Sequence, residues 1–289
     1  MLAAFAPLIG LTVAIIWERE RRKKSEKPPQ TEKLLRPPGY SLSVRFDEIA
    51  DALVFHMLKA VFLGSFSGLF ALITYSLLVA HAPAWWLAIC ILLFVLFVTA
   101  CVMATRRAFG RFQEGRDIRL GLRGEQAVAE ALNEAADNGS RSFHDLQTDK
   151  VGNIDHVAIG ARGVFLVETK ARRRRASRNA QAEHEVIYDG EFLQFPFYRD
   201  SMPIEQAKIN AKWLSNFLEK KTGEPVWVEP PVVLPGRYVT FSGKENFPVK
   251  AMNANYLVGY LRGQGQKIAP AQVRRIITAL DEKCRDVEF

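Results

Sequence analysis

Two acidic residues and a lysine stand out in the middle of the chain because they interrupt or follow otherwise apolar segments. Residues 152–170 contain two apolar runs joined by a short glycine-bounded loop, a pattern that predicts a β-hairpin. Asp155 interrupts the first run, Glu168 interrupts the second, and Lys170 follows two residues later. Because side chains alternate between the faces of a strand, Glu168 and Lys170 are expected on one face. Carboxylates and an ammonium group in this pattern could hold a divalent cation and act on water.

The length of the hairpin loop decides whether the two acids meet. If Ala161 and Arg162 alone form the loop, Asp155 lies opposite Glu168, with Cβ atoms about 5 Å apart. Such a pair of like charges would need a cation between them. A three-residue loop with a bulge would instead place Asp155 opposite Thr169, and a second bulge would be needed to bring the acids together. The sequence leaves both registers open.

A bound divalent ion can align and activate a water, neutralise charge on a substrate and stabilise a leaving oxygen. Magnesium keeps most of its waters and takes few protein ligands. We therefore expect Mg²⁺, or Mn²⁺, to be held by Asp155, Glu168 and the main-chain carbonyl of Thr169. Lys170 would orient or deprotonate the water, or neutralise developing charge. The alternative for Asp155, Glu168 and Lys170 is a structural ion pair at the surface.

Further motifs flank this hairpin in a fixed order. They are Gly121-Leu-Arg-Gly124-Glu125, then Asn153-Ile-Asp155-His156-Val157, then Gly163-Val-Phe-Leu-Val-Glu168-Thr-Lys170, and finally Pro203-Ile-Glu-Gln206. Over about residues 117–260 the chain resembles the nuclease-related domain called NERD, of the PD-(D/E)XK nuclease-like superfamily. The resemblance implies an α/β fold with a mixed central sheet flanked by helices. It also implies a magnesium-dependent nuclease, with DNA as the expected substrate.

Two more polar residues in these motifs are candidates for catalysis. Glu125 is expected near the start of a helix, where Gly121 and Gly124 permit close packing on the sheet; it could support the first metal ion or hold a second. An ordinary first-turn glutamate favoured by the helix dipole is the alternative. Gln206, in the first turn of a later helix, could contact the phosphate or the attacking water. Its alternative is a solvated helix residue.

A dense basic run follows the candidate site and is expected to contact phosphates without reading sequence. Its residues are Arg172, Arg173, Arg174, Arg175 and Arg178. The formal net charge of +8 agrees with an anionic partner, which could be nucleic acid or lipid headgroups. A solvated loop or contact with anionic lipid are the alternatives for this run. Fewer charges are expected at this place in the family, so the run departs from the family pattern.

A second function of a different class also fits the sequence. The chain could be a non-catalytic, membrane-tethered module that uses the same fold to bind nucleic acid or a partner protein. The presence of Asp155, Glu168 and Lys170 together favours the enzyme. DNA versus RNA, and endonuclease versus exonuclease activity, are left open by the sequence.

The elements that precede the site are largely apolar. Residues 1–24 are expected to form a membrane anchor with a basic flank; because the apolar run is short, an interfacial helix remains open. Residues 25–58 combine a proline-containing linker with a juxtamembrane amphipathic helix. Residues 59–107 are expected to form a transmembrane helical hairpin, and residues 112–289 a cytoplasmic nuclease-like domain.

Charge at the ends of the apolar hairpin predicts its orientation. Lys59 precedes it and Arg106 follows it, which predicts that both open ends lie in the cytoplasm. We therefore expect a multi-pass protein of the inner (plasma) membrane of a bacterium. The apolar runs contain no charged residue, which argues against a transporter or channel. Gly64 and Gly68 could let helices pack closely, either as a homo-oligomer or with partners in a membrane complex.

Other patterns predict the frame of the soluble part. Apolar residues at helical spacing predict helices over residues 117–136, 203–218 and 270–284. His144 and His156 have no partners at metal-ligand spacing and are expected to be structural. The three cysteines are expected to remain reduced.

Overall fold

The structure is a computed structural model that describes residues 14, 17–18, 21, 32–81, 83–136, 140–149, 152–173, 184–242, 247–263 and 267–288. The chain divides into two compact units, of which the larger is Arg36–Cys284. In the smaller unit, strand β1 (Leu34–Leu35) pairs antiparallel with β12 (Arg285–Val287). Only four positions within the expected anchor at residues 1–24 are described, so the expectation of a third membrane segment lies outside the described residues.

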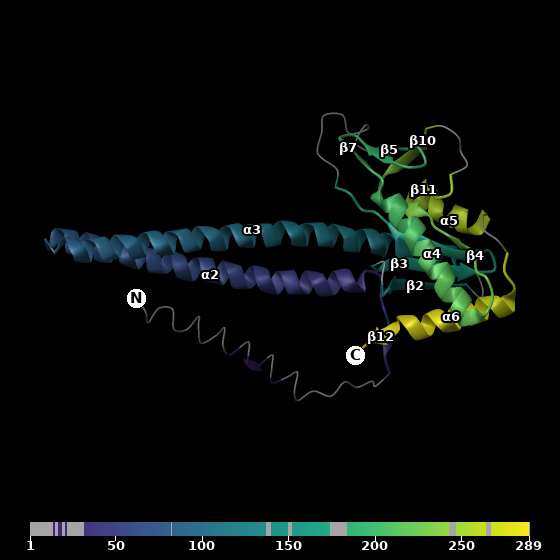
Figure 1. Ribbon diagram of the computed structural model, residues 1–289, viewed down its shortest axis with the longest axis horizontal. Coiled ribbons are helices and arrows are strands. Elements are labelled where there is room, and N and C mark those ends of the chain that lie inside the picture. Colours follow the sequence, from purple (N-terminus) through teal and green to yellow (C-terminus); the bar gives the residue numbers. More distant parts are fainter. Residues whose placement is uncertain are drawn as a thin grey trace. The chain divides into compact units, whose positions relative to one another are not determined.

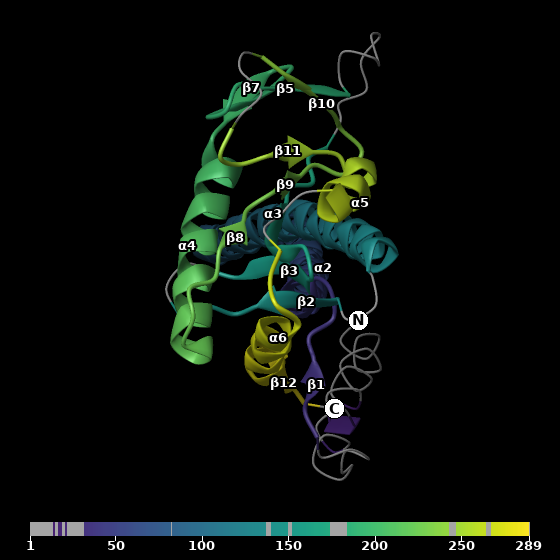
Figure 2. The ribbon, with the colours of Figure 1, turned by 90° about the vertical axis from the view of Figure 1, so that its right-hand side faces the viewer.

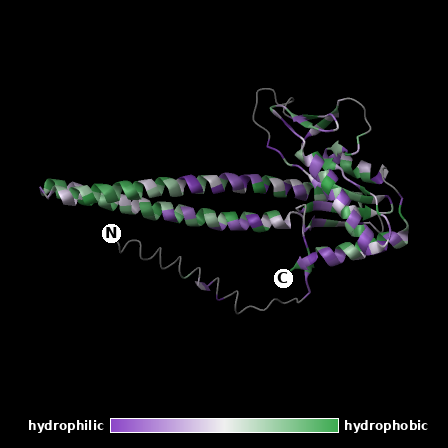
Figure 3. Cartoon of the chain, in the orientation of Figure 1, coloured by the Kyte–Doolittle hydropathy of each residue, from purple (hydrophilic) through white to green (hydrophobic). Residues whose placement is uncertain are grey.

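The larger unit begins with two long helices that run side by side in opposite directions, α2 (Tyr40–Val79) and α3 (Ala84–Ala135) (Figure 1). Their apolar residues gather towards the turn between them, and polar residues become frequent towards the sheet (Figure 3). By length and composition both helices are able to cross a membrane. The expected juxtamembrane helix and first span form one continuous helix, α2.

Helix α3 differs from the sequence expectation because it runs for 52 residues without a break, joining the second apolar run to the helix expected at residues 117–136. Its glycines between those segments cost about 1 kcal/mol each relative to alanine, but contacts with α2 offset this. Gly115 is buried, and a Cβ added there would make an ordinary contact with Ile49 Cγ2 at 3.5 Å. Glu114 accepts from Arg45 of α2 at 2.8 Å and from Arg111 at 2.9 Å.

A mixed six-stranded sheet forms the centre of the α/β part (Figure 2). Its strands are β2 (Arg141–Leu146), β3 (Ile154–Gly160), β4 (Gly163–Thr169), β8 (Val228–Glu229), β9 (Val232–Val233) and β11 (Ala251–Met252). The order is β11-β9-β4-β3-β2, and β8 pairs with β4 beyond this path. Strands β2, β3 and β4 pair antiparallel, whereas β8 and β9 pair parallel to β4, and β11 parallel to β9.

A smaller sheet lies next to this one in the larger unit, with the order β10-β5-β6-β7. Its strands are β5 (Glu185–Tyr188), β6 (Leu193–Phe195), β7 (Tyr198–Asp200) and β10 (Tyr238–Phe241). The Asp189-Gly190 turn joins β5 to β6. The turn is stabilised by the aspartate Oδ1, which accepts the N–H groups of Glu191 and Phe192 at 3.0 and 2.7 Å.

Helices cover both faces of the central sheet (Figure 2). On one face, α3 and α5 (Ala254–Gly263) pack on Phe165 and Val167 of β4. On the other side lie α4 (Met202–Thr222) and α6 (Pro270–Cys284), and Ile204 of α4 joins a core with Val232 of β9. The fold is therefore α/β with a mixed sheet, as expected, and the helices expected at 203–218 and 270–284 correspond to α4 and α6.

Candidate active site

The β3–β4 hairpin adopts the two-residue loop. Gly160 pairs with Gly163 and His156 with Val167, so the same register continued by one residue places Asp155 opposite Glu168. Neither loop residue has a positive φ; instead Gly163 has φ 136°, a value that glycine adopts readily. The alternative register, with Asp155 opposite Thr169, is excluded.

Asp155 is held across the hairpin by a main-chain donor. The N–H of Thr169 donates to Asp155 Oδ2 at 2.6 Å, which fixes the carboxyl beside the end of β4. Burial raises the pKa of Asp155 to about 7, although the Thr169 N–H and nearby Lys170 act in the opposite direction; Asp145 also raises it. This carboxyl is therefore poised between its two protonation states near neutral pH.

Glu168 is the most deeply enclosed acid of the site, with 2% of its surface exposed. Burial, followed by the charge of Asp155, raises the pKa of Glu168 well above its ordinary value, and Lys170 opposes the rise. Glu168 Oε2 is buried without a hydrogen-bond partner. Its backbone is fixed by β9, since Glu168 N donates to Pro231 O at 3.0 Å. A buried carboxyl oxygen without a donor is the type of atom that a cation would satisfy.

Glu125 reaches the two acids from α3, not from the first turn of a helix as the sequence suggested. It lies in the interior of that helix and is buried. Burial and the charges of Asp155 and Asp145 raise the pKa of Glu125 to about 9, whereas the Gly39 N–H, which donates to its carboxyl, lowers it. Glu125 therefore carries its proton at neutral pH.

Close approach of α3 to the hairpin depends on the glycine before Glu125. A Cβ added at Gly124 would lie 2.7 Å from Ala171 Cβ and 3.6 Å from Thr169 Cγ2. Glycine is thus the residue that allows helix and strand end to touch, in agreement with the packing expected from the sequence.

A buried polar cluster beside these acids was not found by sequence reasoning. Asp145 Oδ2 accepts from Arg36 Nη1 at 3.0 Å, from Ser41 N at 2.9 Å and from Ser41 Oγ at 2.6 Å. Its other oxygen, Oδ1, accepts from Asn153 Nδ2 at 3.1 Å. Asp145 has φ 51°, unusual for a non-glycine residue within a strand. This cluster, formed by Arg36, Ser41, Asp145 and Asn153, caps the first turn of α2 and is called the Asp145 cluster below.

The basic run is only partly described. Arg172 donates to Asp200 Oδ2 at 2.7 Å, and Arg173 forms an ion pair with Asp117 at 2.7 Å. Both arginines therefore already have acidic partners. Arg174, Arg175 and Arg178, expected to bind phosphates, lie outside the described residues.

Two other predicted residues take different places. Gln206 is half-buried in the first turns of α4. Among the described residues, no hydrogen bond or ion pair joins it to Asp155 or Glu168. Lys170 is half-buried at the end of β4, and its N–H donates to Val233 O at 2.8 Å.

The two strand histidines form a partly buried pair, in which His156 is the buried member. Their Nδ1 atoms lie 2.8 Å apart, so one ring donates to the other. Burial lowers the pKa of His144 to about 4, and burial followed by the charge of His144 lowers that of His156 well below its ordinary value. Both rings are neutral at physiological pH, in keeping with the structural role expected for them.

The acids fit a magnesium site built from few protein ligands. Within the described ranges, no group of three or more His, Cys, Asp or Glu side chains is arranged to hold a metal ion. Magnesium, however, is often bound through one or two carboxylates and waters. Asp155 and Glu168, with the unsatisfied Glu168 Oε2, meet that requirement.

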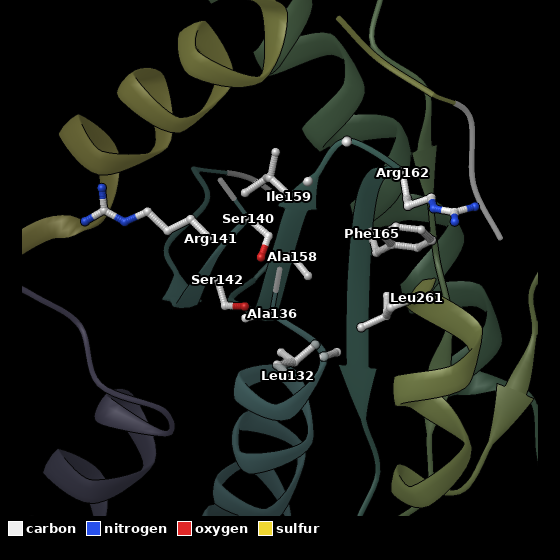
Figure 4. Close-up of a pocket in the computed structure, with 13 residues that line it drawn as sticks. Leu132, Ala136, Ser140, Arg141, Ser142, Ala158, Ile159, Arg162, Phe165 and Leu261 are labelled. Carbon is white, nitrogen blue, oxygen red and sulfur yellow. The ribbon is translucent and has the colours of Figure 1, made fainter. Parts of the chain in front are cut away.

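The hairpin also borders a small cavity that is separate from the acids (Figure 4). It has a volume of about 110 Å³ and lies at the loop end of the hairpin, with Leu132, Ser140, Arg162 and Phe165 in its wall. Asp155 and Glu168 lie at the opposite end of their strands and do not line it.

Comparison with known protein families agrees with the geometry. Residues 120–235 match the family model of NERD, the nuclease-related domain. The matched range contains Glu125, Asp155, Glu168, Lys170 and Gln206. No curated protein and no solved structure matches the chain. Residues 120–235 are therefore similar to a nuclease-related domain, and the chain also contains two helices that are long and apolar enough to cross a membrane.

Proposed function

We propose that this nuclease-related domain is a membrane-anchored, magnesium-dependent nuclease that hydrolyses phosphodiester bonds, with DNA as the expected substrate. One observation supports it above the others. Asp155 and Glu168 are brought together by the hairpin register, and the buried Glu168 Oε2 has no hydrogen-bond donor.

Stability alone gives no reason for this arrangement. Burying a carboxyl without a donor and placing a second one beside it both disfavour the folded state. A bound cation removes both penalties at once. The acids therefore fit a binding site better than a structural ion pair.

Each residue of the site has a defined task in this proposal. Asp155, Glu168 and the carbonyl of Thr169 would hold Mg²⁺ or Mn²⁺, and the Thr169 N–H keeps Asp155 in place. The bound ion would supply an activated water and neutralise charge on the phosphate. The charge of Lys170 lowers the pKa of both acids, and this side chain would orient that water or stabilise the departing oxygen. The protonated Glu125 can donate a hydrogen bond to a neighbouring carboxylate.

Phosphate contacts along the basic run are expected to be unequal. Arg172 and Arg173 would have to leave Asp200 and Asp117, or share their donors, before binding a phosphate. We therefore expect Arg174, Arg175 and Arg178 to contribute more to the affinity.

The membrane helices support a location for this activity. We propose that the apolar halves of α2 and α3 cross the plasma membrane of a bacterium, and that basic residues at both open ends hold the domain in the cytoplasm. Residues 1–24 would add a further membrane segment. Lipid is then a partner of the chain. Gly64 faces Cys101 of α3, whereas Gly68 borders open space on α2, where a second copy or another membrane protein could pack.

The test is a cleavage assay with the full chain in detergent or nanodiscs. Single- and double-stranded DNA and RNA are offered with Mg²⁺, with Mn²⁺ or with a chelator. We expect metal-dependent cleavage that falls roughly a hundredfold or more in Asp155→Asn and Glu168→Gln. Asp149→Asn is the matched control, since that acid is 81% exposed and pairs with Lys283. Binding without cleavage of any substrate would refute the enzyme and favour the non-catalytic module.

A further inference from the structure

We propose that an aromatic groove beside the outer strand of the central sheet binds unpaired nucleobases of the substrate. The aromatic groove is lined by Tyr238, Phe241, Lys250, Met252, Tyr256 and Tyr260, among others. The proposal rests on the nuclease function above and deepens it, because it names single-stranded or frayed nucleic acid as the preferred substrate.

The groove presents ring surface to solvent. Tyr238 is 55% exposed, Phe241 49% and Tyr256 63%. The groove has a volume of about 460 Å³, within the usual range of small-molecule sites and sufficient for a base. Every base offers a π-face, so exposed aromatic rings hold single strands without selecting a sequence.

The walls of the groove are held by contacts outside it. Tyr260 lies one turn after Tyr256 on α5, and its hydroxyl donates to Glu229 Oε2 at 2.9 Å. On the β10 side, the ring of Phe241 packs against Phe247 and Tyr188, with centroids 6.4 and 6.2 Å apart. Because these rings are already fixed, little ordering is needed when a base binds.

The strand register places the groove close to the acids. Glu168 of β4 pairs with Val232 of β9, and Val232 pairs with Ala251 of β11, a residue of the groove wall. Neighbouring strands lie about 4.8 Å apart, so two steps across the sheet cover about 10 Å. This separation is between the main chains of Glu168 and Ala251, and it is comparable to about three stacked nucleotides at 3.4 Å each.

Hydrogen bonds connect the rim of the groove to the chain that follows Lys170. Asn253, which lines the groove, donates through Nδ2 to Arg237 O at 2.6 Å. Arg237 Nη2 in turn donates to Arg172 O at 3.2 Å and to Arg173 O at 2.8 Å. A strand lying along the basic run would therefore reach the groove within a few nucleotides.

The charge of the groove is compatible with an anionic ligand such as nucleic acid. Among the described residues that line the groove, Lys250 is the one with a charged side chain, so the groove has cationic character. Aromatic rings combined with a basic path are the usual composition of a site for single strands. Bases in an intact duplex are stacked on one another, so they could enter the groove only after fraying.

The test measures binding of the full chain to a fluorescent oligonucleotide, single-stranded or as a duplex, in chelator-containing buffer where no cleavage occurs. Tyr256→Ala should weaken single-strand binding about tenfold, Tyr256→Phe should preserve it, and duplex binding should change little. Phe197→Ala is the matched control, because Phe197 is also well exposed and lies outside the groove.

Three results would overturn the inference, and they differ in what they imply for the nuclease. Unchanged single-strand binding in Tyr256→Ala, with metal-dependent cleavage intact, would remove the groove as a base site and leave the nuclease standing. Absence of binding and cleavage in the unmodified chain would remove both. Equal weakening by Phe197→Ala would also refute a specific role for the groove.

Discussion

Ionisation of Asp155 is expected to destabilise the metal-free protein as the pH rises. The pKa of this carboxyl is about 7 in the folded chain against an ordinary value of 3.8. Between these values the folded state binds more protons than the unfolded state, so the free energy of unfolding falls with increasing pH. A separation of about three pKa units, at about 1.4 kcal/mol each, corresponds to about 4 kcal/mol at most.

Replacement of Asp155 by asparagine removes the charge while keeping an oxygen that can accept the Thr169 N–H. We therefore expect Asp155→Asn to flatten the decline in stability between about pH 4 and pH 7. Above pH 7 the variant should equal or exceed the unmodified chain in the absence of metal. Added Mg²⁺ should stabilise the unmodified chain by mass action, by about 2.7 kcal/mol at one hundred times its dissociation constant, and should not stabilise the variant.

The measurement is urea unfolding of the full chain in detergent, followed by tryptophan fluorescence at several pH values with chelator or Mg²⁺. Trp213 and Trp227 report on the α/β part, because they lie on α4 and just before β8. Asp149→Asn should leave the pH dependence unchanged. If Asp155→Asn is less stable than the unmodified chain at pH 8 by more than about 1 kcal/mol, Asp155 is mainly a structural acceptor and the metal site is refuted.

Four further results are expected. Gly124→Ala should destabilise the chain by about 1–3 kcal/mol and slow cleavage, because the added methyl pushes α3 off the hairpin; urea unfolding and a rate assay check this. Arg36→Ala should cost about 3–5 kcal/mol in the same unfolding measurement by leaving Asp145 buried without its cation, and Asp145→Asn in that background should recover part of the loss. Lys170→Ala should keep the Mg²⁺-dependent stabilisation but lose most of the cleavage rate. A cysteine placed beside His81 should be labelled by an impermeant reagent in intact cells, whereas labelling only after lysis would contradict the orientation.

Matched variants separate these effects from general damage. Gly110→Ala adds the same methyl to α3 where it meets open space, so it should be neutral or mildly stabilising. A loss as large as that of Gly124→Ala would show that helix packing on the hairpin is not the cause. Arg45→Ala removes a partly exposed ion pair and should cost less than about 1 kcal/mol.

Local pattern was enough to predict the hairpin but not what surrounds it. The alternation around Asp155 and Glu168 and the glycines at the loop predicted the strands, and the observed pairing is one of the two registers that the sequence left open. The Asp145 cluster could not be predicted, because Arg36 and Asp145 are 109 residues apart and no local period connects them. The one available sign was an acid inside the short apolar strand that ends at Leu146.

Continuity of α3 was missed for a similar reason. The change from apolar to charged composition after Thr105 suggested a boundary, yet composition reports the surroundings of a helix and not its end. No proline stops the helix there, and the joined segment contacts α2, for example through Glu114 and Arg45. Only the packing of α3 against α2 in the folded structure shows that the helix continues.

The ion pair between Arg36 and Asp145 has a consequence for how the chain is placed in a membrane. Arg36 lies ahead of the helical pair and Asp145 lies beyond it, so the two meet only if both are delivered to the same side of the bilayer. A chain that crosses once would leave them on opposite sides, with Glu125 deprived of the Gly39 N–H as well. If the helical pair spans a membrane as proposed, assembly of the acids requires an even number of crossings. A molecule inserted with a single crossing would carry all the acidic residues and still lack the folded site.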